Sequence, residues 1–95
     1  MIKIFKFGGT SIKDADSVKR ITQILRKYAH ENLVVVFSAM GKVTNMLEEV
    51  VEEYMNKSGN SARKLQKVKD FHTSILEALF EQNHAIYNEV NNLFV

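Results

Sequence analysis

The residues that set the fold class of this chain stand at its start: Ile2-Lys3-Ile4-Phe5-Lys6-Phe7-Gly8-Gly9-Thr10-Ser11-Ile12. The apolar and β-favouring residues among the first of these predict a strand over residues 2–7 that is buried on at least one face. The strand ends at two glycines, which let the backbone take positive φ and approach a ligand closely. Two hydroxyl side chains follow at Thr10 and Ser11. A phosphate fits such a turn, although a glycine pair after a strand also serves as a tight connection without a ligand.

A helix and a second strand follow this turn. Asp14 can cap a helix whose apolar residues recur at helical spacing, at Val18, Ile21, Leu25 and Tyr28. The apolar, β-branched run over residues 33–37 then predicts a central strand that is covered on both faces. Strand, helix and strand form a βαβ unit, which places the carboxyl ends of both strands at the same edge of the sheet. We therefore expect an α/β fold in which Lys6–Ser11 and Ser38–Asn45 face one crevice.

The second half of the chain is predicted to be helical. Apolar residues at helical spacing predict helices over residues 43–55, from residue 61 to about residue 80, and after a break near Asn83. Four glutamates share one side of the first of these helices, Glu48, Glu49, Glu52 and Glu53, and we interpret them as a solvated face and not as a metal or acid/base site. His72 and His84 have no partner ligands at metal spacing, so we expect packing or surface roles for them and predict no metal site.

Length and composition limit the classes of function. With 95 residues, 45% hydrophobic and 25% charged, the chain has the composition of one small globular domain. A net charge of +2 is too small to indicate a nucleic-acid partner, and we interpret the basic stretch over residues 57–69 as a solvated helix surface. No cysteine, no signal peptide and no membrane-length apolar run is present. We expect a cytoplasmic protein with no membrane partner.

Two loops remain as candidates for chemistry. Only four glycines occur, at 8, 9, 41 and 59, so neither the Walker P-loop nor the dinucleotide GxGxxG pattern is completed. The strings KFGGTSI and SAMGKVTN each carry glycine and hydroxyl side chains and lead into a helix. Thr44 stands near a helix N-terminus, which favours an anion, yet turn formation and capping alone also explain Ser38, Thr44 and Asn45. Lys6 ends a strand and must keep its ammonium paired or hydrated, and a phosphate oxygen would pair it.

These two strings resemble a known family. The run Lys6–Ile12, preceded by Ile4, resembles the N-terminal signature of aspartokinases, and the run Val34–Asn45 resembles their second loop at the expected distance. The resemblance implies the α/β/α sandwich with a mostly parallel sheet of the amino-acid kinase superfamily. It further implies ATP-dependent phosphorylation of the β-carboxylate of L-aspartate to 4-phospho-L-aspartate. That reaction opens the biosynthesis of lysine, threonine and methionine.

The resemblance also implies roles for individual residues. Lys6 would be the catalytic residue, placed against the transferring phosphate. The ATP phosphates would be bound by Lys6, Gly8, Gly9, Thr10 and Ser11, and the aspartate substrate by Ser38, Gly41 and Thr44. Some members place the glycine of the second loop one residue later, where Lys42 stands here. The Mg²⁺ ligands, and an acidic residue and an arginine of the aspartate site, are expected outside this chain.

Family members continue well beyond the length of this chain, so we expect residues 1–95 to be a truncated N-terminal part of a catalytic domain. By itself the chain is expected to be inactive and to form a homo-oligomer or self-associate through uncovered surfaces. Two alternatives stay open. One is another acyl-phosphate-forming enzyme, such as a glutamate or acetylglutamate kinase, and the other is a non-catalytic helical interaction fragment.

Overall fold

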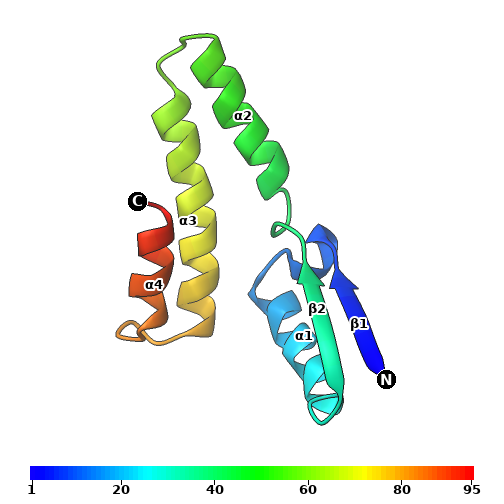
Figure 1. Ribbon diagram of the computed structural model, residues 1–95. Coiled ribbons are helices and arrows are strands. Elements are labelled where there is room, and N and C mark those ends of the chain that lie inside the picture. Colours follow the sequence, from blue (N-terminus) through cyan, green and yellow to red (C-terminus); the bar gives the residue numbers. More distant parts are fainter. The chain divides into compact units, whose positions relative to one another are not determined.

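The computed structural model describes all 95 residues and alternates strands and helices in its first half before three helices in its second (Figure 1). The elements are β1 (Ile2–Phe7), the 3₁₀-helix η1 (Gly9–Ile12), α1 (Ala15–Lys27), β2 (Asn32–Phe37), α2 (Val43–Met55), α3 (Ser61–Leu79) and α4 (Ile86–Leu93). The predicted α/β class, both strands and the helices are confirmed. The chain divides into two compact units, residues 1–44 and 45–95, and each is described by itself.

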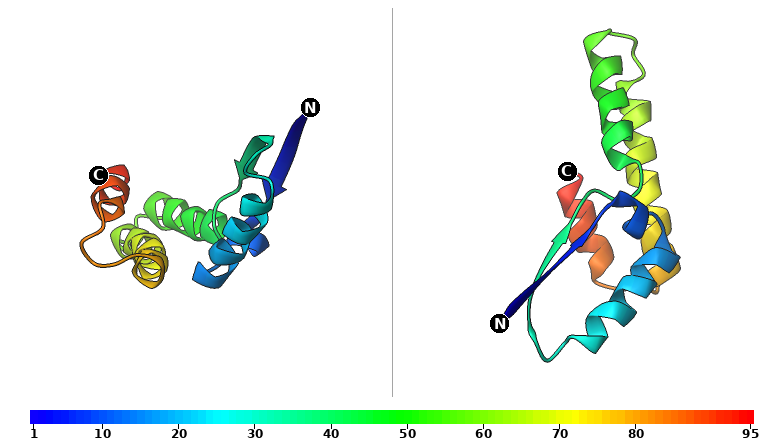
Figure 2. Two further views of the ribbon diagram at one scale, coloured as in Figure 1. Left: turned by 90° about the horizontal axis from the view of Figure 1, so that it is seen from below. Right: turned by 90° about the vertical axis from the view of Figure 1, so that its right-hand side faces the viewer.

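The first unit is a βαβ unit. β1 and β2 pair in parallel, in a register that runs from Ile2 opposite Asn32 to Phe7 opposite Phe37. α1 connects the strands and lies against one face of the pair, so that strands and helix form two layers (Figure 2). The rings of Phe5 on β1 and Tyr28 at the end of α1 meet edge to face, with their centroids 5.0 Å apart. Ile21 on α1 is buried, so the core of this unit lies between α1 and the strand pair.

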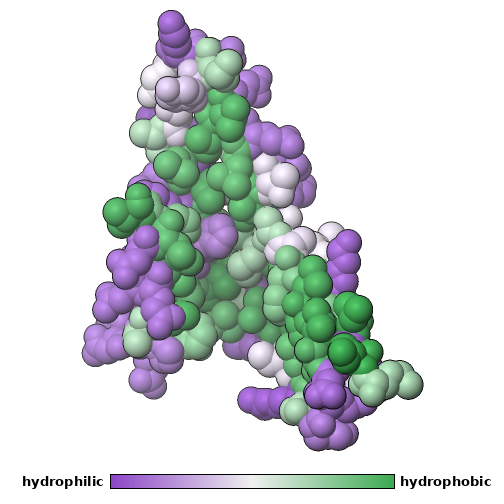
Figure 3. Space-filling model, in the orientation of Figure 1, coloured by the Kyte–Doolittle hydropathy of each residue, from purple (hydrophilic) through white to green (hydrophobic).

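The opposite face of the strand pair is open. Because side chains alternate along a strand, the residues that face away from α1 are Ile2, Ile4, Lys6, Asn32, Val34 and Val36. Ile4 is 70% exposed and Val36 is 44% exposed, and this face is apolar in Figure 3. The prediction that the second strand is covered on both faces is therefore wrong for this chain, because the one helix of the βαβ unit covers one face only.

The start of α1 is held by a reciprocal cap. The Asp14 carboxylate accepts a hydrogen bond from the Ser17 N–H at 2.8 Å, and the Asp14 N–H donates to the Ser17 hydroxyl at 3.0 Å. Each group thereby satisfies a backbone donor that the first helical turn leaves unpaired. The predicted cap at Asp14 is confirmed, and Ser17, which is buried, is its second half.

The second unit is a helical hairpin with a third, short helix. α2 and α3 run antiparallel, and α4 returns along α3 (Figure 1). The turn between α2 and α3 contains Lys57 and Gly59 at positive φ. Val68 and Ile75 of α3 are buried, and the Tyr87 hydroxyl of α4 donates to the carbonyl oxygen of Phe80 at 3.0 Å. These contacts attach α4 to the end of α3.

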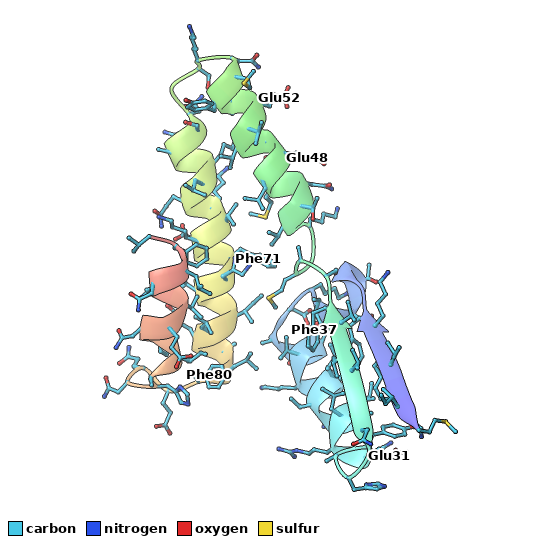
Figure 4. The ribbon with its side chains drawn as sticks, viewed as in Figure 1. Glu31, Phe37, Glu48, Glu52, Phe71 and Phe80 are labelled. Atoms are coloured by element: carbon cyan, nitrogen blue, oxygen red, sulfur yellow. The ribbon has the colours of Figure 1, made fainter.

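His72 and the glutamates of α2 were expected to pack and to face solvent, respectively, and the structure places them as follows. His72 has its Nδ1 2.7 Å from the Val68 carbonyl oxygen and its ring edge to face with Phe94, which is a packing role. Glu48 and Glu52 point away from α3 (Figure 4), while Glu49 forms an ion pair with Lys64 at 3.5 Å. None of the helices combines the length and the apolar character needed to cross a membrane.

Candidate functional site

The two loops that carry the sequence motifs lie side by side at the carboxyl ends of β1 and β2. We call residues 8–12 the first loop and residues 38–42 the second loop. The Ser38 N–H donates to the Phe7 carbonyl oxygen at 3.0 Å, and the Gly41 N–H donates to the Gly9 carbonyl oxygen at 3.1 Å. These bonds extend the strand pairing past its last residues. The parallel, in-register strands therefore bring the predicted phosphate-binding and aspartate-binding residues to one edge.

The glycines of these loops serve different geometric needs. A Cβ atom on Gly9 would lie 2.7 Å from the Gly41 carbonyl oxygen and 3.3 Å from that of Ala39, whereas one on Gly8 would meet nothing within 4 Å. Gly8 has φ −81°, and in the two loops only Gly41, at 52°, has positive φ. Neither Gly8 nor Gly9 uses the positive φ that glycine permits. Gly9 allows the loops to approach each other, and Gly41 takes the left-handed conformation.

The first loop presents polar groups around one buried anchor. Ile12 is 4% exposed, and the Ser11 N–H donates to the Gly8 carbonyl oxygen at 3.0 Å, which closes the turn of η1. The side chains of Thr10 and Ser11 are exposed. The first backbone N–H groups of a helical turn have no partner within the helix, so this turn offers donors to an anion.

Lys6 lies on the open face of the strand pair, two residues before the first loop. It stands opposite Val36 in the register, is exposed, and forms no ion pair within the chain. Strand alternation places it on the face away from Phe5 and Phe7. Its ammonium is therefore hydrated and free to pair with an anion near the strand ends.

The second loop leads directly into α2. The Ser38 hydroxyl donates to the Ala39 carbonyl oxygen at 2.9 Å, and the Val43 N–H donates to the Met40 carbonyl oxygen at 3.0 Å. Thr44 is exposed in the first turn of α2. Ser38, Gly41 and Thr44 thus follow one another along a single connection beside the first loop.

The charges near this edge are mainly positive. Lys6 and Lys42 are exposed there. Asp14 follows the first loop closely, but hydrogen bonds from the Ser17 backbone N–H and hydroxyl hold the pKa of Asp14 below its ordinary value, so it serves as an ionised helix cap. At the other end of β1, a hydrogen bond to Glu31 raises the pKa of Lys3. The carboxyl edge of the strands is consequently suited to an anionic ligand.

The chain has no group of three or more His, Asp or Glu side chains that could hold a metal ion.

Sequence reasoning missed the contact between Gly9 and Gly41. A glycine at either position is visible in the sequence, but the position of the opposing carbonyl oxygens is a long-range property of the paired loops. The only available signal was that both strand-end loops contain glycine and share an edge.

Comparisons with known proteins agree with the motifs. The model of the amino acid kinase family matches residues 1–92. The chain is 34% identical to the lysine-sensitive aspartokinase 3 of Escherichia coli over 97% of its own length, and 28% identical to the chloroplastic aspartokinase 2 of Arabidopsis thaliana over 95%. It spans 20% and 17% of the lengths of these two relatives, respectively. The resemblance to aspartokinases is thereby confirmed.

A solved structure has a similar fold. The crystal structure of E. coli aspartokinase III in complex with aspartate and ADP matches 99% of this chain with a TM-score of 0.78 and 33% sequence identity, and the match covers 20% of that structure's chain. A second crystal structure of the same enzyme, in complex with lysine and aspartate, matches with a TM-score of 0.77. The mixed α/β arrangement of this chain is therefore the one found in a solved aspartokinase.

Proposed function

This chain belongs to the amino acid kinase family, and on that premise we propose that it supplies the nucleotide and amino-acid loops of an aspartate kinase. The proposed reaction is transfer of the γ-phosphoryl group of ATP to the β-carboxylate of L-aspartate, which gives 4-phospho-L-aspartate. The observation that carries the proposal is the pairing of the KFGGTS and SAMGKVTN loops at one strand edge. The similar E. coli enzyme, whose structure is a complex with aspartate and ADP, supports this choice of substrates.

We assign the residue roles as follows. Lys6 and the backbone N–H groups of the first loop would neutralise and orient the phosphates, with Thr10 and Ser11 beside them. Ser38, Gly41 and Thr44 would hold the aspartate. A carboxylate oxygen attacks the γ-phosphorus, the bond to the β-phosphate oxygen breaks, and ADP leaves. The nucleophile is already ionised, so the step requires alignment and charge neutralisation but no general base.

The proposed catalytic domain extends beyond this chain. The chain spans about one fifth of the length of its aspartokinase relatives, and we propose that residues 1–95 form the N-terminal part of such a domain. The Mg²⁺ that accompanies ATP would then be held by residues outside this range. The open apolar face of the strand pair supports this proposal, because a contiguous exposed apolar face marks a surface against which another element packs.

The test is an activity assay with a substrate panel. The intact protein that carries this chain is supplied with ATP, Mg²⁺ and, in separate reactions, L-aspartate, L-glutamate or N-acetylglutamate, and ADP formation is measured. We expect aspartate-dependent turnover. Turnover with glutamate or acetylglutamate alone would instead identify another acyl-phosphate-forming kinase.

The 95-residue chain provides a second measurement. We expect no turnover from this chain alone, while calorimetric titration with ATP and with aspartate reports whether the loops bind either ligand. Absence of heat with both ligands, together with no turnover by the intact protein, would favour the non-catalytic interaction fragment. The cytoplasmic location and self-association stay predictions from the sequence, to be checked by cell fractionation and by sedimentation.

A further inference from the structure

We propose that Lys42, on the second loop, is a substrate-affinity residue that pairs with the α-carboxylate of the amino-acid substrate. This inference rests on the proposed function, because it assumes that the second loop holds aspartate. The residues assigned to aspartate on that connection, Ser38, Gly41 and Thr44, are all neutral. Lys42 would add the positive charge that a substrate with two carboxylates calls for.

The backbone of Lys42 is held on both sides. The N–H of the preceding residue, Gly41, donates to the Gly9 carbonyl oxygen at 3.1 Å, which ties the second loop to the first. The following residue, Val43, is 5% exposed, and its N–H donates to the Met40 carbonyl oxygen at 3.0 Å. The base of the Lys42 side chain is therefore fixed at the edge where the two loops meet, while its flexible stem lets the ammonium reach a ligand.

The Lys42 ammonium has no acidic partner within residues 1–95. The ion pairs of the chain join Lys3 to Glu31 and Lys64 to Glu49. Lys42 takes part in neither, and its side chain is exposed. Its charge is therefore hydrated and available to an anion that reaches this edge of the strands.

The charge of Lys42 stands at an unfavourable place for the stability of α2. Lys42 directly precedes α2, and the N-terminus of a helix carries a partial positive charge that favours anions over cations. The helix α1 follows this rule, since Asp14 caps it and Asp16 lies in its first turn, whereas the first turn of α2 contains no acidic residue. Helix stability thus gives no reason for a lysine here, and a bound carboxylate would offset its charge.

The chemistry of the proposed reaction indicates which carboxylate Lys42 pairs with. The β-carboxylate is the nucleophile, and a cation paired with it would withdraw the electron density that the attack needs. Pairing with the α-carboxylate holds the substrate without that cost, so Lys42 should affect binding and not the transfer step. Loss of a hydrogen bond to a charged group weakens binding by about tenfold to a hundredfold, and an exposed position favours the lower end of that range.

The experiment uses the intact protein that carries this chain, with three variants. Lys42→Met removes the charge, Lys42→Arg keeps it, and Lys19→Met removes one charge from an exposed position on α1. Calorimetric titration gives the Kd for aspartate and the Kd for ATP, and steady-state kinetics gives kcat.

We expect Lys42→Met to raise the Kd for aspartate about tenfold, and to leave the Kd for ATP and kcat within about threefold of the wild type. Lys42→Arg should bind aspartate more tightly than Lys42→Met does. Higher ionic strength should narrow the difference between Lys42→Met and the wild type, because salt screens an exposed charge. The thermal unfolding midpoint of Lys42→Met should equal or exceed that of the wild type.

The outcomes separate this inference from the proposed function. A wild-type protein without aspartate-dependent turnover would remove the proposed function and the role of Lys42 with it. In an active enzyme, the role of Lys42 alone is overturned if Lys42→Met and Lys19→Met bind aspartate equally well, or if Lys42→Arg binds it no better than Lys42→Met.

Two other results would assign Lys42 a different role and overturn the inference. A raised Kd for ATP, or a lowered kcat with an unchanged Kd for aspartate, would show that Lys42 acts on the phosphates. An unfolding midpoint of Lys42→Met below that of Lys19→Met would show that the side chain supports the fold. Weaker binding of aspartate alone, at an unchanged or higher midpoint, supports the pairing.

Discussion

Replacing Lys6 with methionine removes one positive charge from the carboxyl edge of the strand pair and keeps an unbranched side chain of similar length. Lys6 is exposed and has no ion-pair partner within the chain. Substitutions at exposed positions without such partners usually change the free energy of unfolding by less than about 0.5 kcal/mol. Lys6→Met should therefore leave the urea unfolding midpoint of the chain nearly unchanged.

The effect on activity should be much larger. In the proposed reaction Lys6 neutralises charge on the transferring phosphoryl group, and removing one such preorganised group typically costs about one hundred- to one thousandfold in kcat, or about 2.7–4 kcal/mol. The intact kinase is assayed by aspartate-dependent ADP formation at saturating ATP. The wild-type and variant proteins are compared at equal folded concentration, which circular dichroism verifies.

A matched control distinguishes the effect of losing the charge at Lys6 from the effect of losing any one positive charge. Lys19→Met removes the same charge from an exposed site on α1, and its kcat should stay within about twofold of the wild type. Activity of Lys6→Met equal to that of this control would refute the catalytic role of Lys6. A large fall in the unfolding midpoint of Lys6→Met would refute the premise that its side chain has no structural role.

Three further predictions concern stability. Ser17→Ala removes the hydroxyl that accepts from the Asp14 N–H and should lower the free energy of unfolding by about 1 kcal/mol in urea titration; an unchanged midpoint would argue against the cap. The pKa of Asp14 is lowered in the folded chain, so the contribution of its carboxylate to stability is complete above the ordinary pKa of 3.8 and is lost as the pH falls through the lower pKa of the folded chain. Asp14→Asn should therefore reduce the loss of stability on acidification. An acid dependence of stability identical to that of the wild type would contradict this cause. Val68→Ala, at a position 3% exposed, should cost about 2 kcal/mol, whereas Val51→Ala, at a position 60% exposed, should stay within about 0.5 kcal/mol; equal thermal shifts would show that the helical unit packs differently.

Most of the fold follows from local patterns. The run before Gly8 predicts β1, the spacing from Val18 to Tyr28 predicts α1, and the break near Asn83 separates α3 from α4, as observed. These predictions succeed because strand and helix periodicity and capping depend on neighbouring residues. The covering of β2 was not predicted correctly, since burial of a strand face depends on which elements pack against it.

Part of the candidate site, the two loops at the strand ends, could be predicted from the sequence. Parallel pairing of the strands predicts that the loops after Phe7 and Phe37 share an edge, and the structure brings them together. The sequence suggests a role for Gly9 from the conformational freedom of glycine, whereas the structure shows a steric limit there, and both favour glycine. The absence of positive φ at Gly9 and the closeness of its Cβ position to the Gly41 carbonyl oxygen, 2.7 Å, distinguish them.

By itself, the sequence determined the order of the elements, the family and the residue types at the strand ends, since each of these is written in spacing and in short motifs. The tertiary structure decided that Lys6 is exposed on the open face, that Ser17 completes the cap of α1, and that Gly9 faces the backbone of the second loop. Each of these depends on atoms brought together by strand pairing or helix formation, whose distances no local pattern contains.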